Sequence, residues 1–434
     1  MSEETGRHAG TGTAPRAAIG EHTAATRRVL LLPPLPGALG HGLRITAAAR
    51  AAELAGQPGL AAAYRDLAPA ASAGDDRDTA RTAAVLAFTD RVTLAPDRAG
   101  AGLLTALSAQ GFDAPAVVAL AQICAFVSYE ARVAAGLALL AGGPAAGTDD
   151  GRPATGPDVP VAQAPDAAGS AAPFTLDQLT WLPRIPAVDA DALTAEQRAV
   201  VDAHATLSTA SPYYRTLLHD PAALDHRTHV YNAVMYGRGG LPRAERELAT
   251  LVVSRVNGCV YCASVHGRKY AQLSRDEAKA LRVLRDGADA FTPLTTPETA
   301  GTDTGTGTGT GTDASTGTDA STGTDASTGT DAGAGAVADP RGSAVARFAE
   351  AQTRTPPQAG ARHLAALRAA GLDDAELTDL VHAVALFGWA NRLMLVLGDA
   401  HHPGTPLPDT GSPRTDARES CSGTSVPAPR TGDA

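Results

Sequence analysis

The chain has 434 residues, a formal net charge of −10 at pH 7, and 44% hydrophobic but only 4% aromatic residues. This length exceeds what one core usually holds, so we expect two globular units. The acidic balance and the lack of any run of five basic residues argue against nucleic acid and acidic membranes as partners.

The N-terminus, residues 1–28, is polar and rich in Gly, Ala and Thr, and we predict that it is disordered. It lacks the basic and then apolar order of a secretory signal. The longest apolar run, residues 117–140, is interrupted by Glu130 and Arg132, which favours a buried helix over a membrane span. Four cysteines in a chain of this length do not form a disulfide framework. We therefore expect a cytoplasmic protein.

An internal repeat organises the chain. The segment that starts at Ala87 aligns without a gap with the segment that starts at Arg347, at an offset of 260 residues (347 − 87). Matched pairs include Phe88 with Phe348, Pro96 with Pro356, Gly111 with Gly371, Asp113 with Asp373 and Arg132 with Arg392. Each copy predicts a helix, a short loop, a second helix, and then a long apolar helix after a Gly-Phe/Leu-Asp cap.

The repeat predicts two homologous helical domains. In chain order we predict a domain at 29–141, a linker at 142–173, a domain at 174–402 and a disordered tail at 403–434. Residues 301–333 repeat the phrase TGTDAS and have no apolar face, so we predict a flexible insertion at about 290–340 in a surface loop of the second domain. Strand signals are poor throughout, and the predicted fold class is all-α.

The stretch NGCVYCASVH, residues 257–266, contains two of the four cysteines. Residues 241–256 have a proline in the first turn and then an apolar run, which predicts a helix. Asn257-Gly258 predicts a left-handed stop, followed by a second helix over 259–270. Cys259 and Cys262 would then lie in its first turn, where the positive helix end favours thiolate, so we expect a lowered thiol pKa.

The same stretch predicts a proton relay beside the thiols. The three-residue spacing lets the sulfurs of Cys259 and Cys262 meet and close a disulfide. His266 follows Cys262 by four residues, so the two share one helical face and His266 could take or relay a thiol proton. Glu247, on the preceding helix, could hold the imidazole ring or complete the relay.

Other interpretations of these residues stay open. Cys259, Cys262 and His266 could bind zinc with Glu247 as fourth ligand, although no second CxxC or HxxxH pair exists. Ala263 after the second cysteine excludes the haem motif CxxCH. Taken alone, His266 is typical of a structural or surface histidine, and Glu247 of a solvated first-turn glutamate. We expect Cys124 to be a core cysteine, Cys421 an incidental thiol of the tail, and Tyr261 a packing residue that could line the site.

The spacing Glu247-x11-Cys259-x2-Cys262-x3-His266 resembles the site motif of the AhpD-like alkylhydroperoxidases, in the carboxymuconolactone decarboxylase superfamily. The stretches SPYYRTLLHDP and NAVMYGRGGLPRAERELATLVVSRVNGCVYCASVHG resemble its peroxidase-related branch. The similarity is close over about 174–285 and resumes at 343–400, and it is weaker over about 30–141.

The resemblance implies an all-helical fold that assembles as trimers or hexamers, and a peroxide-reducing thiol pair. It implies that Cys262 attacks the peroxide and that Cys259 resolves the sulfenic acid to a redox-active disulfide, with Glu247 and His266 as the proton relay. Some members have a histidine directly before the second cysteine, where this chain has Tyr261. The implied partners are an organic hydroperoxide and a dithiol reductant, such as a lipoyl-carrying protein or a low-molecular-weight thiol. We expect no metal or other cofactor, and a homo-oligomer of the trimer type.

The first domain departs from this motif. When Gly56 is set against Gly258, the places of Cys259, Cys262 and His266 are taken by Gln57, Leu60 and Tyr64. No Cys or His occurs between positions 42 and 111. We therefore predict a degenerate first domain that supplies packing or an intramolecular partner for the second.

The leading functional hypothesis is a thiol-dependent alkyl hydroperoxide reductase of peroxiredoxin type, an oxidoreductase with peroxide as acceptor. One alternative is a decarboxylase-like enzyme of the superfamily, whose chemistry needs no CxxC pair. Another is a non-enzymatic thiol redox sensor or scaffold, which the duplicated helical units and low-complexity segments allow.

Overall fold

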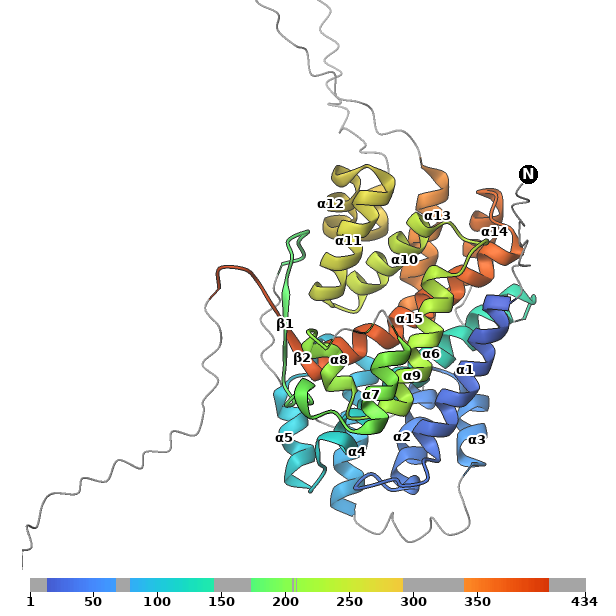
Figure 1. Ribbon diagram of the computed structural model, residues 1–434. Coiled ribbons are helices and arrows are strands. Elements are labelled where there is room, and N and C mark those ends of the chain that lie inside the picture. The colour runs from blue at the N-terminus through green and yellow to red at the C-terminus, as the bar shows by residue number, and fades with distance from the viewer. Residues whose placement is uncertain are drawn as a thin grey trace, which may run out of the picture.

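The computed structural model describes residues 14–67, 79–143, 173–204, 207, 209–291 and 339–405. Within these ranges the chain forms fifteen α-helices, a few short 3-10 turns and a two-stranded sheet, which confirms the all-α fold class (Figure 1). Most of the predicted linker, insertion and tail, including Cys421, lies outside the described residues.

The elements of the first half are α1 (Ala14–Leu31), α2 (His41–Leu54), α3 (Pro58–Arg65), α4 (Thr79–Leu94), η2 (Pro96–Arg98), α5 (Ala101–Ala109) and α6 (Ala114–Leu140). The second half begins with β1 (Thr180–Pro183), η3 (Ala190–Ala192), α7 (Ala195–Ala203), α8 (Pro212–Leu217), α9 (Pro221–Tyr236), α10 (Arg243–Val256), α11 (Val260–Ser274), α12 (Glu277–Asp286) and η4 (Gly287–Phe291). It ends with α13 (Pro340–Thr353), α14 (Ala361–Ala369), α15 (Asp374–Leu397) and β2 (Gly398–His401).

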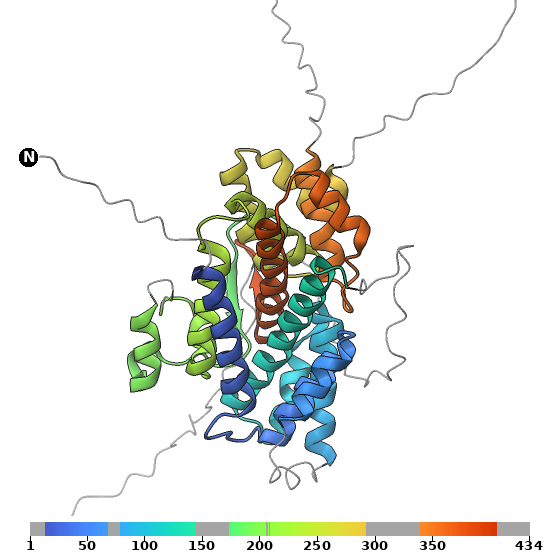
Figure 2. The ribbon, with the colours of Figure 1, turned by 90° about the vertical axis from the view of Figure 1, so that its right-hand side faces the viewer.

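The prediction of disorder over residues 1–28 is wrong from Ala14 onward, because α1 begins there. This helix packs along α9, and the two lie side by side in Figures 1 and 2. Its buried residues include Ile19, Leu30 and Leu31. The helix is polar on average, so the composition of residues 1–28 did not indicate its narrow apolar stripe. Packing of that stripe against the rest of the protein, rather than helix propensity, stabilises α1.

Two long helices, α6 and α15, pack against each other at the centre of the molecule (Figure 2). Each begins at an aspartate N-cap: Asp113 accepts from Ala116 N at 3.0 Å, and Asp373 from Glu376 N at 2.8 Å. By length and composition both helices could cross a membrane, but 72% and 89% of their most apolar windows are buried inside the protein. Their place in the core accounts for their hydropathy.

The contacts of two buried arginines follow the sequence repeat. Arg132 on α6 donates to the backbone O of Thr353, and Arg392 on α15 donates to the backbone O of Thr93 at 2.9 Å. Thr93 and Thr353 are themselves 260 residues apart, so each arginine reaches the equivalent carbonyl of the opposite half. Both guanidinium groups also donate to Thr355 Oγ1, at 2.9 and 3.3 Å.

A second pair of contacts has the same relationship. Trp389 Nε1 donates to Gln122 Oε1 at 2.9 Å, and the Tyr129 hydroxyl lies 3.2 Å from His382 Nδ1. Tyr129 and Trp389 are equivalent in the repeat, as are Gln122 and His382. The two halves thus meet in an interface whose contacts occur in exchanged pairs, as at a two-fold interface between identical subunits.

The short sheet was not predicted from the sequence. Strand β1 pairs antiparallel with β2, with Trp181 opposite Ala400, and so joins the start of the second half to its end. Trp181 Nε1 donates to Met394 O at 3.1 Å, and its ring lies where a Cβ on Gly398 would clash. The paired residues are more than 200 positions apart in the sequence, so a local sequence pattern does not predict the sheet.

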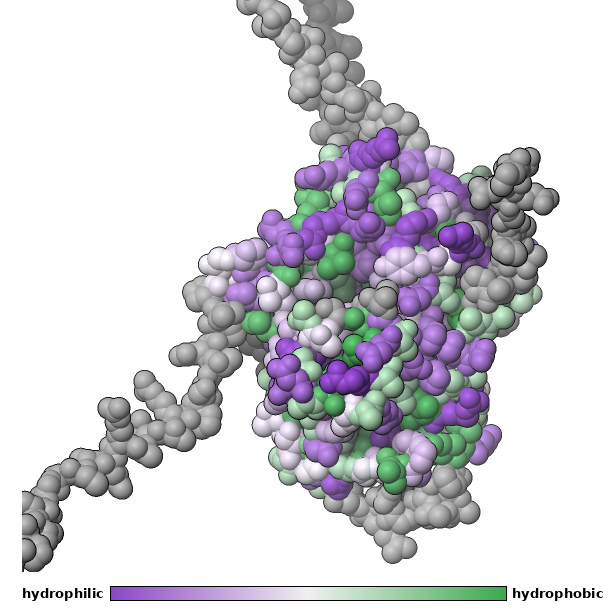
Figure 3. Space-filling view, viewed as in Figure 1, coloured by the Kyte–Doolittle hydropathy of each residue, from purple (hydrophilic) through white to green (hydrophobic). Residues whose placement is uncertain are grey.

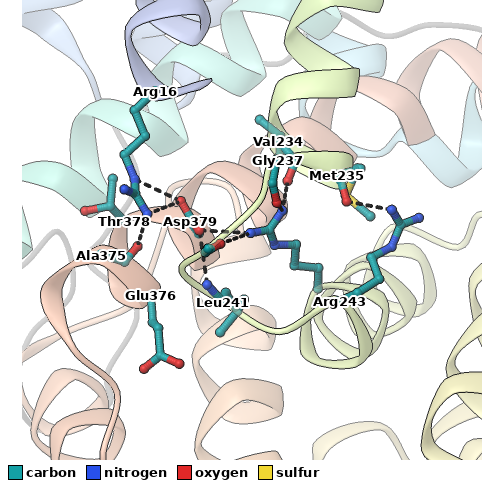
Figure 4. A network of polar contacts seen from close by, with 12 residues as sticks. Arg16, Val234, Met235, Gly237, Leu241, Arg243, Ala375, Glu376, Thr378 and Asp379 are labelled. Atoms are coloured by element: carbon teal, nitrogen blue, oxygen red, sulfur yellow. Dashed lines mark hydrogen bonds and ion pairs between the residues drawn. The ribbon is translucent and has the colours of Figure 1, made fainter. Parts of the chain in front are cut away.

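Asp379 on α15 joins three segments (Figure 4). Its carboxylate accepts from Arg16 Nε at 3.1 Å, from Arg246 Nη2 at 3.0 Å and from Leu241 N at 3.1 Å. The network therefore fixes α1 and the start of α10 against the central helix. On the face shown in Figure 3, hydrophobic residues form small separate patches between hydrophilic ones.

Candidate active site

The thiol-bearing stretch lies at a tight turn between α10 and α11. Asn257 caps α10, Gly258 adopts φ +74°, and Cys259 N donates back to Ser254 O at 2.8 Å. Gly258 N donates to Arg255 O at 3.1 Å, which completes a Schellman motif. This is the predicted left-handed stop, and it places Cys259 directly at the start of α11.

The turn between α2 and α3 has the same hydrogen bonds. Gly56 has φ +70°, and its N–H donates to Glu53 O at 2.9 Å. Gln57 N donates to Ala52 O at 2.9 Å. The alignment of Gly56 with Gly258 therefore matches two turns of the same geometry. Gln57 follows the glycine of the first turn where Cys259 follows that of the second.

Both turns press against the opposite half of the chain. A Cβ on Gly258 would lie 2.8 Å from the Asp97 Cβ of η2, and one on Gly56 would lie 3.0 Å from the Pro356 Cβ. Asp97 and Pro356 lie in the equivalent loops after α4 and α13. The first half therefore covers the turn that presents the thiols.

Cys259 is the N-cap of α11 and Cys262 lies in its first turn. Both thiols are free, and Cys262 is close enough to Cys259 to raise its pKa. Both are buried: Cys259 is 1% exposed and Cys262 is 4% exposed. The second cysteine is thus the marginally more accessible of a closely packed pair.

The expected lowering of the thiol pKa is wrong for Cys259. Burial, and then the neighbouring Cys262 thiol, raise the pKa of Cys259 well above its ordinary value. A helix N-terminus stabilises a negative charge by only about 0.3–1 kcal/mol at an exposed site. Full desolvation of the thiolate outweighs this gain.

Asn391 on α15 ties the turn to the core and was not identified from the sequence. Its Oδ1 accepts from Asn257 Nδ2 at 3.0 Å, and its Nδ2 donates to Ser254 Oγ at 3.2 Å. The Asn391 amide also lowers the pKa of Cys259, which partly opposes the rise caused by burial. Asn391 is fully buried, and its amide ties Ser254 of α10 and Asn257 of the turn to α15.

His266 and Glu247 meet between α11 and α10. His266 Nδ1 lies 2.6 Å from Glu247 Oε2, and Phe387 packs edge-on against the imidazole at a centroid distance of 4.4 Å. Glu247 is fully buried, and His266 is 7% exposed. The structure therefore brings together the two residues that the sequence assigned to a relay, on the helix face that also contains Cys262.

Arg243 is a further partner of Glu247. Its Nε donates to Glu247 Oε1 at 2.6 Å, and its Nη1 donates to Met235 O at 2.6 Å, the contact drawn in Figure 4. Burial raises the pKa of Glu247, but His266 and Arg243 outweigh it and hold that pKa below its ordinary value. The i,i+4 spacing of Arg243 and Glu247 was the signal available in the sequence.

Tyr213 and Arg227 form another buried pair close to the thiols. Arg227 Nη2 donates to the Tyr213 hydroxyl at 3.2 Å, and Trp181 packs edge-on against Tyr213 at 5.4 Å. Burial raises the pKa of Tyr213, Arg227 lowers it, and the charges of Cys262 and Cys259 contribute further. Tyr213 therefore lines the thiol site as a neutral phenol.

The corresponding position in the first half has different chemistry. The Tyr64 hydroxyl donates to Glu130, which also pairs with Arg27. Tyr64 stands where the second half has His266, but its carboxylate partner comes from α6 instead of the preceding helix. This site contains no thiol, and its three polar groups satisfy one another.

The other cysteine and aromatic predictions also have structural outcomes. Cys124 lies fully buried in α6, and burial raises its pKa to about 12, as a core cysteine requires. Tyr261 is partly buried and packs against the core. A cavity of about 320 Å³ near this region is lined by Arg243 and by the loop from Gly237 to Pro242. Arg243 lines this cavity and also donates a hydrogen bond to Glu247.

The fold and site define an all-helical protein with two buried thiols at a helix start and, one turn further along, a histidine in contact with a buried glutamate. Residues 221–293 match the family model described as the carboxymuconolactone decarboxylase family. The match runs from α9 to η4 and contains all four predicted site residues, so this segment is similar to that family. No curated protein and no solved structure gives a significant match to the chain.

Proposed function

We propose that the protein is a thiol-dependent hydroperoxide reductase in which Cys259 and Cys262 cycle between dithiol and disulfide. The observation that carries the proposal is the pair of neighbouring free thiols at the start of α11, on the same helix as His266, whose Nδ1 lies 2.6 Å from Glu247 Oε2. A decarboxylase-like reaction of the same superfamily has no use for such a pair.

The cycle assigns a distinct role to each group. His266 takes the proton of the Cys262 thiol, and the thiolate attacks one oxygen of the hydroperoxide. The O–O bond breaks, the alcohol leaves with the proton from His266, and Cys262 becomes a sulfenic acid, oxidised by two electrons. Glu247 fixes the imidazole and stabilises its charged form.

The second step closes the disulfide. The Cys259 sulfur attacks the sulfur of Cys262, the S–O bond breaks, and the hydroxide leaves as water with the Cys259 proton. The raised pKa of Cys259 suits this order, because a protonated thiol is a poor first nucleophile. An external dithiol then returns two electrons and two protons.

The test is peptide mapping and intact mass of reduced protein before and after one equivalent of cumene hydroperoxide. The proposal expects the loss of two hydrogens, located in a Cys259–Cys262 bridge. Cys259→Ser should instead accumulate a sulfenic acid on Cys262, while Cys124→Ser, which changes a buried cysteine outside the pair, should leave the result unchanged. Thiols that survive the peroxide intact would refute the proposal.

The burial of both thiols favours a second candidate, a thiol redox sensor that reacts once per stimulus. Repeated turnover of peroxide with a dithiol such as dihydrolipoamide separates the two. Sustained consumption of peroxide indicates an enzyme. One equivalent of oxidation without turnover indicates a sensor.

We also propose that residues 29–141 are a degenerate copy of the second domain, 174–402. The exchanged arginine contacts and the two matching turns support a duplication whose halves pack as a homodimer would. On this view three chains would supply six domains. Light scattering of the purified protein tests the trimer, and the activity of residues 174–402 alone tests the need for the first domain.

A further inference from the structure

Four histidines and one aspartate gather between α1, α9 and the residue that follows α7. They are His22, His204, Asp225, His226 and His229. None of them belongs to the thiol site. Helices α1 and α9 lie side by side in Figures 1 and 2, so the cluster joins the N-terminal helix to the second half of the chain.

Asp225 lies at the centre of the cluster. Its Oδ1 lies 2.7 Å from His204 Nε2 and 3.8 Å from His229 Nε2. Its Oδ2 lies 3.5 Å from His226 Nδ1. One carboxylate therefore faces three imidazole rings that come from two separate segments.

The helix α1 adds a fourth ring. His22 stacks on His229 with centroids 4.0 Å apart and an angle of 7° between the planes. His22 Nδ1 lies 3.1 Å from His226 Nδ1. One of these two nitrogens must be unprotonated, since two N–H groups would repel each other.

We propose that His204, Asp225 and His229 bind one divalent transition-metal cation of the Zn²⁺ type. One ligand atom from each lies within 4.8 Å of the other two. Ligand atoms around a tetrahedral Zn²⁺ lie about 3.3 Å apart, which follows from bonds of about 2.0–2.1 Å. Small side-chain rotations convert the observed arrangement into that geometry.

The remaining residues fit the role of outer partners. A metal-bound carboxylate is normally hydrogen-bonded by a second group, and His226 lies next to the free oxygen of Asp225. His22 in turn contacts His226, so α1 supports the site. A simple ion pair between His204 and Asp225 explains one of these contacts but not the convergence of the other three rings.

The donor set also selects the class of metal. Two imidazoles and one carboxylate suit Zn²⁺, Co²⁺ or Ni²⁺, whereas Mg²⁺ and Ca²⁺ prefer oxygen ligands alone. The side chain of His204 is 3% exposed and that of His229 is 45% exposed, so the site is anchored at one side and open to solvent at the other. A cation can therefore enter without unfolding of the chain.

The experiment uses the full chain without a histidine tag, with Cys259→Ser and Cys262→Ser to remove the thiol pair as a competing ligand. ZnCl₂ is titrated by calorimetry, and the thermal midpoint is followed in parallel. The proposal expects one Zn²⁺ per chain and a midpoint that rises with Zn²⁺, because binding to the folded state stabilises it.

Three further variants in this background decide the result. His229→Ala and Asp225→Asn should each weaken Zn²⁺ binding at least about tenfold, since even changes to outer partners commonly cost that much. His219→Ala changes a half-buried histidine outside the cluster, whose Nε2 lies 2.8 Å from Pro186 O, and should bind Zn²⁺ as the parent does. His229 is half-exposed, so its loss leaves the fold intact. Absence of binding in the micromolar range, or undiminished binding in both cluster variants, would overturn the proposal.

Discussion

His266 Nδ1 and Glu247 Oε2 lie 2.6 Å apart, across two helices that one tight turn connects. Because Nδ1 faces the carboxylate, Nε2 is the ring nitrogen left for exchange with the thiols. The Glu247 carboxylate is fully buried, and its second partner is the guanidinium group of Arg243. The orientation of the His266 imidazole therefore depends on the Glu247 carboxylate.

Glu247→Gln should slow peroxide reduction by up to about 100-fold, because the amide no longer stabilises the charged imidazole through which the proton passes. The measurement is the rate of Cys262 oxidation in stopped-flow experiments over a range of pH. The matched control is Glu245→Gln, on the same helix, whose carboxylate pairs with Arg341 instead. Equal rates in both variants would contradict the relay.

Glu247 also predicts a pH dependence of stability. Its pKa in the folded protein is lowered from the ordinary 4.5, since His266 and Arg243 outweigh the effect of burial. A lowered folded-state pKa contributes stability that is complete above the unfolded pKa and is lost as the pH falls through the folded pKa. The difference in unfolding free energy between wild type and Glu247→Gln should therefore shrink as the pH falls below the ordinary value of 4.5.

Urea denaturation at several pH values measures this difference. A gap between the two proteins that stays constant from neutral pH down to the acid limit of folding would show that Glu247 is not held ionised by its partners. Glu245→Gln again serves as the comparison, because the Glu245 side chain is partly exposed.

Cys259 should be alkylated with an apparent midpoint above 9.0, its ordinary thiol pKa, because burial raises the pKa. Iodoacetamide labelling against pH, followed by peptide mass spectrometry, reports each cysteine separately. Cys262→Ser should lower the Cys259 midpoint, because the neighbouring thiol is the second cause of the shift, but should leave it above 9.0. Cys124, with a pKa raised to about 12, is the internal reference. A Cys259 midpoint below 9.0 would disagree with the buried environment.

The turn and the contact between Glu247 and His266 could be predicted from the sequence because their signals are local. Asn257-Gly258 ends one helix by the geometry that glycine favours, and the spacing to His266 follows from the helical repeat. The pairing of Glu247 with His266 needs only that two adjacent helices pack antiparallel. Residues on neighbouring elements were therefore within reach of pattern reasoning.

The residues that the sequence did not reveal act over long separations. Asn391 reaches the thiol turn from more than 130 residues away, and β1 and β2 pair from opposite ends of the second half. The histidine cluster had one local signal in the sequence, the i,i+4 pair of Asp225 and His229. His22 lies in α1, a segment for which we predicted disorder from the sequence. Such contacts depend on tertiary packing, which the periodicity of hydrophobic residues along the sequence does not predict.

Gly258→Ala should destabilise the protein by at least about 1 kcal/mol, because an L-residue at φ +74° is strained. The new Cβ would also lie 2.8 Å from the Asp97 Cβ in the first half, so the cost should exceed the backbone strain alone. Gly20→Ala, in the interior of α1 with open space around it, is the matched control and should stabilise by about 0.5–1 kcal/mol.

The part of this destabilisation that comes from the contact of residue 258 with Asp97 in the first half can be measured separately. In an Asp97→Gly background the Cβ that Gly258→Ala would meet is gone, so only the backbone strain remains and the destabilisation should fall. The four unfolding free energies form a double-mutant cycle, and its coupling energy reports how firmly η2 of the first half presses on the thiol turn. If Gly258→Ala costs the same in both backgrounds, the first half does not constrain the turn. A clear coupling energy would mean that the first half, which lacks the CxxC pair, shapes the position of Cys259 and Cys262 in the second half.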